Sequence, residues 1–194
     1  MESIGEKIGF IALILTTLSL GTSPHPFILI LCYGIHELGH LIFSYVAGAD
    51  MKGFKIGSLR LRLFYSCENL SYKRELLVQS GGIIFNLISA LIVSFLPIFR
   101  GDVADFFKIC SISLALFNLY PVSVLDGGGM LKSLLCILCS NLNVQRVCDI
   151  VSFLCAVIMW LISVYLQLVF NSNISLFIIS VFLLMELCFS YKYN

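Results

Sequence analysis

Long apolar runs, separated by short polar or proline-containing stretches, dominate this chain. A helix needs about 20 mostly apolar residues to cross a bilayer, so the pattern predicts about six transmembrane helices. The six segments lie at about residues 8–23, 27–48, 76–99 and 105–121, and on the two sides of residues 171–173 within the run 150–185. Pro121 and the polar turn at 171–173 supply the breaks. The expected fold class is an all-α polytopic membrane protein.

Between the second and third predicted helices, at about residues 48–75, the long apolar runs stop and apolar residues alternate with polar ones. Leucines at every second position are separated by arginines: Leu59, Arg60, Leu61, Arg62 and Leu63. Period two favours a strand, and Gly53 and Gly57 predict turns before it. We therefore expect a short membrane-associated β-hairpin. Its arginines either lie at the lipid headgroups, or its free edge binds an extended substrate by strand addition.

Composition supports the membrane assignment. Of the 194 residues, 59% are hydrophobic and 12% are charged, and the mean hydropathy is +1.01, whereas soluble domains carry about 25% charged residues. The net charge of +1 indicates no particular partner. The basic residues form no patch able to neutralise several phosphates, so nucleic acid is excluded as a partner. Most of the eight cysteines lie in apolar runs, where cysteine packs as a small hydrophobe.

The distribution of lysine and arginine predicts the orientation. With the N-terminus inside, ten of the 12 basic residues fall on the inner side, which is where such residues accumulate. The ten are Lys7, Lys52, Lys55, Arg60, Arg62, Lys73, Arg74, Lys132, Arg146 and Lys192, against Arg100 and Lys108 outside. Both termini are therefore expected in the cytosol.

The second predicted helix carries the sequence His-Glu-Leu-Gly-His at residues 36–40. Residues four apart share one face of a helix, so His36 and His40 can bind the same zinc ion. Glu37 then lies beside the metal, where it can take a proton from an activated water and pass it to a leaving amine. This is the metalloprotease pattern, placed at membrane depth.

A catalytic zinc ion takes three protein ligands and a water, so a third ligand is expected. Asp126 follows the break at Pro121, and a lone aspartate in a spanning segment needs a partner because its insertion costs about 2.5–3.5 kcal/mol. It can cap the following helix or bind the metal, and the histidine pair favours the metal. Asn86 and Asn118 can position a substrate carbonyl or form interhelical hydrogen bonds, and we lean to the first role.

Three segments together resemble the site-2 proteases, the intramembrane zinc metalloproteases. They are His-Glu-Leu-Gly-His at 36–40, Gly-Gly-Ile-Ile-Phe-Asn at 81–86, and Asn-Leu-Tyr-Pro followed by Leu-Asp-Gly-Gly at 118–128. The resemblance implies that His36, His40 and Asp126 bind one zinc ion per chain and that Glu37 is the general base. It also implies that Asn86 and Asn118 help to place substrate.

The six-helix layout is similar to the bacterial branch that contains stage IV sporulation protein FB. This similarity implies a single domain over residues 1–194 with a catalytic core at about 27–130, and neither a PDZ nor a nucleotide-sensing domain. It further implies a bacterial cell membrane, a membrane-tethered protein substrate such as a precursor transcription factor, and a regulatory membrane protein as a further partner. Two other hypotheses stay open: a divalent-metal transporter, which has no need of Glu37, and an inactive membrane scaffold.

Overall fold

The computed structural model describes residues 25–56, 61–66, 70–96, 101–139, 143–170 and 175–193. The chain divides into two compact units, Met1–Asn118 and Leu119–Asn194. The described part of the first unit contains three helices and two strands: α2 (His25–Val46), β1 (Asp50–Ile56), β2 (Leu61–Ser66), α3 (Tyr72–Phe95) and α4 (Asp102–Asn118). The second contains α5 (Asp126–Leu138), α6 (Val144–Phe170) and α7 (Ser175–Tyr193).

Three described helices are long and apolar enough to cross a membrane: Pro26–Val46, Tyr72–Phe95 and Val144–Val169. They confirm the predicted second, third and fifth segments, and the multi-pass membrane class with them. The third and fifth begin earlier than hydropathy indicated, because their first turns carry polar residues such as Arg74 and Arg146. The first predicted segment lies outside the described residues. Helix α4 and the apolar part of α7, Leu176–Cys188, are shorter.

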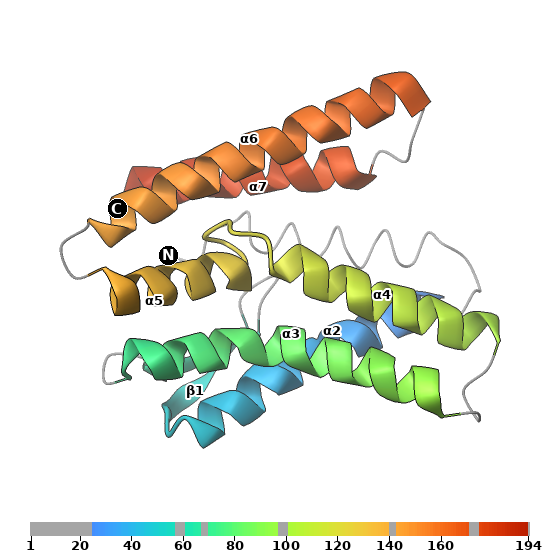
Figure 1. The fold of residues 1–194 in the computed structure, drawn as a ribbon, viewed down its shortest axis with the longest axis horizontal. Helices are drawn as coiled ribbons and strands as arrows, with labels where there is room; N and C mark the ends of the chain where they lie inside the picture. Colours follow the sequence, from blue (N-terminus) through green and yellow to red (C-terminus); the bar gives the residue numbers. More distant parts are fainter. Residues whose placement is uncertain are drawn as a thin grey trace. The chain divides into compact units, whose positions relative to one another are not determined.

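In the first unit, α2, α3 and α4 pack against one another (Figure 1). Ile28 and Cys32 of α2 and Phe107 of α4 form a buried apolar cluster. Many large apolar side chains on the other faces are exposed, including Leu38 and Ile42 of α2. Exposed apolar side chains on this scale suit helices that are surrounded by lipid rather than water.

Helix α2 ends in a Schellman motif. Gly48 has a φ of 70°, a conformation that glycine adopts without a Cβ penalty. The amide of Ala49 donates to the carbonyl of Ser44 at 3.0 Å, and the amide of Gly48 donates to the carbonyl of Tyr45 at 3.1 Å. The chain leaves the helix here and enters β1.

Strands β1 and β2 pair in antiparallel register, with Ile56 opposite Leu61 and Met51 opposite Tyr65. The register is irregular between Met51 and Phe54, so Gly53 lies within the strand rather than in the turn that was expected there. Glycine is favoured at such irregularities because it tolerates the altered backbone. Gly57, the other expected turn residue, lies outside the described residues.

Two glycines set the distance between α2 and α3. A Cβ added to Gly81 would lie 2.7 Å from the carbonyl oxygen of Gly39, and a Cβ on Gly39 would collide with the carbonyl of Gly81. The helices therefore meet backbone to backbone, an approach that only small residues allow in membrane helices. Everything that α3 presents to the histidine face of α2 depends on this short separation.

In the second unit, α6 contacts both α5 and α7. The hydroxyl groups of Ser163 on α6 and Ser180 on α7 are 3.0 Å apart and both buried. Such a hydrogen bond between small residues holds neighbouring membrane helices in register. Leu119–Leu125, the segment ahead of α5, is held against α6, as the site described below requires.

We predict that Gly39→Ala lowers the stability of the first unit, because the new methyl group forces α2 and α3 apart. Overpacking of this kind costs about 1–3 kcal/mol. Thermal unfolding of the detergent-purified protein measures the effect. Gly34→Ala is the matched control, since its Cβ meets no atom within 4 Å. Equal unfolding temperatures for the two variants would contradict the close helix contact.

Candidate metal centre

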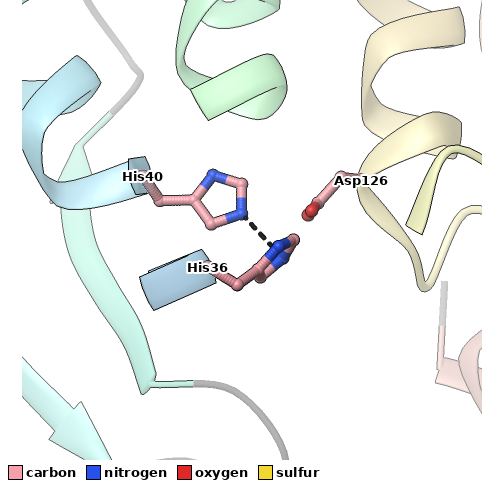
Figure 2. A group of neighbouring side chains, drawn as sticks. All are labelled: His36, His40 and Asp126. Carbon is pink, nitrogen blue, oxygen red and sulfur yellow. Dashed lines mark hydrogen bonds between the residues drawn. The ribbon is translucent and has the colours of Figure 1, made fainter. Parts of the chain in front are cut away.

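His36 and His40 lie one turn apart on α2 and face each other (Figure 2). Their rings are nearly perpendicular, with centroids 4.8 Å apart. The two Nε2 atoms are 3.3 Å apart, and the side chains are 3% and 9% exposed. The predicted pairing of the two imidazoles on one helix face is present, in a buried setting.

Helix α3 holds the outer nitrogen of each ring. Nδ1 of His40 is 2.9 Å from the carbonyl oxygen of Val78, and Nδ1 of His36 is 3.2 Å from the amide nitrogen of Asn86. Both Nε2 atoms are consequently the ones turned toward each other. Outer partners of this type orient metal-ligating histidines in metalloproteins.

Gly82 makes room for the two rings. A Cβ at this position would lie 2.5 Å from Nε2 of His40 and 2.6 Å from Cε1 of His36. Any side chain here would displace both imidazoles. The role of Gly82 was missed at the sequence level, although adjacent glycines in an apolar span are a signal for close approach of another group.

Glu37 follows His36 on α2 and is half-buried. Its neighbours along the helix are therefore the first histidine and the exposed Leu38. The role of Glu37 as a general base stays a prediction.

Asp126 is the first residue of α5, in the second unit, and is 5% exposed (Figure 2). Two glycines follow it, and a Cβ on either would collide with the preceding segment: Gly127 with the carbonyl of Leu119, and Gly128 with that of Val122. The segment ahead of Asp126 therefore folds tightly over the start of α5.

Helix α6 anchors the same segment. The hydroxyl of Tyr120 donates to the carbonyl of Cys155 at 3.0 Å, and the amide of Ser123 donates to the hydroxyl of Ser152 at 2.9 Å. These bonds fix the irregular backbone before α5, which at membrane depth must be satisfied by protein partners. Asp126 is thereby held at a defined position within its unit.

Of the two asparagines, Asn86 contacts His36 and is 0% exposed. Asn118 ends α4, and its amide nitrogen donates to the carbonyl of Leu114 at 3.0 Å in its own helix. Contact of either residue with substrate stays a prediction.

The histidine pair fits zinc. Two ligands of a tetrahedral zinc ion with Zn–N distances of about 2.0–2.1 Å are separated by about 3.3 Å, which matches the distance between the two Nε2 atoms, 3.3 Å. Imidazole nitrogens combined with a carboxylate form a donor set of catalytic zinc ions. His36, His40 and Asp126 carry groups of these types, and their binding to one ion stays a prediction.

Comparisons with known proteins found a family model that matches part of the chain and solved structures with a similar fold. The family model described as "Peptidase family M50" matches residues 100–162, a segment that contains Asn118 and Asp126. None of the curated proteins matches the chain. Among solved structures, the chain is similar to the site-2 protease from Methanocaldococcus jannaschii, with a TM-score of 0.71. The two are 19% identical, over 93% of this chain and 86% of that one.

The more specific resemblance to the sporulation branch, and the expectation of a bacterial cell membrane, stay predictions. The family model and the shared fold agree with the histidine pattern of α2, which lies outside the matched segment. The chain is thus similar to peptidase family M50 over residues 100–162 and to a site-2 protease in its fold.

Proposed function

We propose that this chain hydrolyses a peptide bond of a membrane-tethered protein, within or next to the bilayer, using one zinc ion held by His36, His40 and Asp126. The observation that carries the proposal is the facing pair of Nε2 atoms at 3.3 Å. His36, His40 and Asp126 are all buried, and each offers a ligand atom suited to a metal. Zinc is preferred because two imidazoles and one carboxylate leave a position open for water, as in its catalytic sites.

Each residue then has a defined role. His36 and His40 would hold the metal through Nε2, and Asp126 would hold it through a carboxylate oxygen. When bound, a metal would supply Lewis-acid chemistry that lowers the pKa of a water to about 7. The carboxylate of Glu37 would accept a proton from the attacking water and return it to the nitrogen of the leaving amine. The burial of His36 and His40 keeps bulk water from competing for their ligand nitrogens.

The substrate class follows from the setting of the site. The histidine motif lies in the middle of a helix that is long enough to cross a membrane, so a protein that reaches it must itself be held in or at the bilayer. A regulatory protein with a membrane anchor, such as a precursor transcription factor, meets that condition. The basic residues favour a site that faces the cytosol, with both termini on that side.

Purified wild-type protein should contain about one zinc ion per chain, and Asp126→Ala should lose most of it, since two histidines alone form an incomplete site. Elemental analysis after gel filtration measures the content. Asp149→Ala is the matched control, because Asp149 bonds to Gln145 on its own helix and should keep its zinc. Retention of zinc by Asp126→Ala would show that the third ligand is another residue.

Glu37→Gln should keep zinc but lose proteolysis by at least about 100-fold, the lower end of what general acid–base catalysis contributes. The amide has the shape of the carboxylate and cannot accept the proton. New protein termini in membranes from cells that express wild type or Glu37→Gln measure cleavage without knowledge of the substrate. Cleavage at the wild-type rate by Glu37→Gln would refute the mechanism, and zinc flux into proteoliposomes by the wild type would favour transport instead.

Gly82→Ala should weaken zinc binding by about 10- to 100-fold, the range found when groups that orient metal ligands are lost. The added methyl group overlaps both imidazoles. Competition with a chelator of known affinity gives the binding constant. Gly34→Ala makes the same chemical change in an open position and should bind zinc as tightly as the wild type. Unchanged affinity in Gly82→Ala would mean that the imidazoles are not confined as described.

A further inference from the structure

The two histidines have different partners at their outer nitrogens. Nδ1 of His40 faces the carbonyl oxygen of Val78 at 2.9 Å. A carbonyl oxygen can only accept a hydrogen bond, so Nδ1 of His40 carries the proton of the neutral ring and Nε2 presents its lone pair toward His36. The backbone of α3 thereby selects the form of His40 that can bind a metal.

His36 depends on a side chain instead. The amide of Asn86 lies against Nδ1 of His36, with its nitrogen 3.2 Å away. If that nitrogen donates, Nδ1 must be the acceptor and the proton of the neutral ring sits on Nε2, which faces His40. An Nε2 that carries a proton cannot be a metal ligand. If the amide is turned over, Oδ1 accepts from Nδ1–H and Nε2 is free to bind.

No hydrogen bond from a described residue to Oδ1 of Asn86 holds the amide in the orientation in which its nitrogen faces His36. Oδ1 of Asn86 is buried and has no hydrogen-bond partner among the described residues. The oxygen and nitrogen of an amide differ only in their hydrogen-bond partners, so the ring of His36 decides which of them faces it. Since Asn86 is 0% exposed, water has little access to replace either group.

We propose that Asn86 is a positioning residue for the metal: its Oδ1 accepts a hydrogen bond from Nδ1–H of His36 and fixes the ring with Nε2 as the ligand atom. It does for His36 what the carbonyl of Val78 does for His40. The inference rests on the proposed zinc site and assigns Asn86 a role other than the substrate contact expected from the sequence. Both histidines are then oriented by one helix, α3.

Zinc affinity of the purified full-length chain tests this proposal. Asn86→Leu has a similar size but no acceptor, and should bind zinc about 10- to 100-fold more weakly than the wild type. Asn86→Asp keeps an acceptor, forms a carboxylate–histidine pair and should bind zinc about as tightly as the wild type. Ser89→Ala is the matched control: it removes a hydrogen bond one turn away, from the Ser89 hydroxyl to the Asn86 carbonyl, and should leave zinc affinity unchanged.

Two results would overturn the inference. If Asn86→Leu binds zinc as tightly as the wild type and only its cleavage rate is reduced, Asn86 contacts substrate rather than positioning the metal ligand. Weak binding by Asn86→Asp would mean that the amide N–H, not the oxygen, is needed. The second result decides the matter even if Asn86→Leu does not fold.

His36→Ala separates this inference from the proposed function. If the wild type holds no zinc, or His36→Ala keeps it, the proposed zinc site itself is wrong. If His36→Ala loses zinc while Asn86→Leu keeps it, the zinc site stands and only the role of Asn86 is refuted.

Discussion

The backbone contact between Gly39 and Gly81 is the constraint on which the first unit depends. With side chains at those positions, α3 would stand farther from α2, and neither the carbonyl of Val78 nor the amide of Asn86 would reach the imidazoles. Membrane helices gain little from apolar burial against lipid, so close packing and interhelical hydrogen bonds must hold them together. The same contact thus serves stability and the orientation of the candidate ligands.

The second unit also has to hold a candidate ligand in place, and it does so with contacts to an irregular segment. Asp126 follows an irregular segment, whose polar backbone groups must be satisfied at membrane depth. Tyr120 and the amide of Ser123 bond to α6, and the glycines after Asp126 let the segment lie directly on the start of α5. Glycine is therefore used in both units for one purpose, which is to bring backbone close to the residues that carry the proposed chemistry.

The local hydropathy pattern predicted the positions of the described spanning helices well, but it predicted the residues at which they begin less well. Apolar length identifies a spanning segment because the bilayer sets it, but the polar first turns of α3 and α6 carry no hydropathy signal, so both helices begin before the predicted positions. Gly53 was read as a turn and lies within β1, since glycine is favoured both in turns and at strand irregularities.

The sequence by itself determined the histidine pair, because residues four apart on a helix share a face whatever surrounds them. It also determined that Glu37 directly follows the first histidine on the helix and that the protein belongs in a membrane, and it singled out Asp126 as a lone aspartate in a predicted spanning segment. Only the tertiary structure decided that Val78 and Asn86 hold the outer nitrogens and that Gly82 leaves space for the rings. These residues lie 38 to 50 positions from the histidines they contact, and the separation of two helices is set by packing along their whole length, which no local spacing encodes.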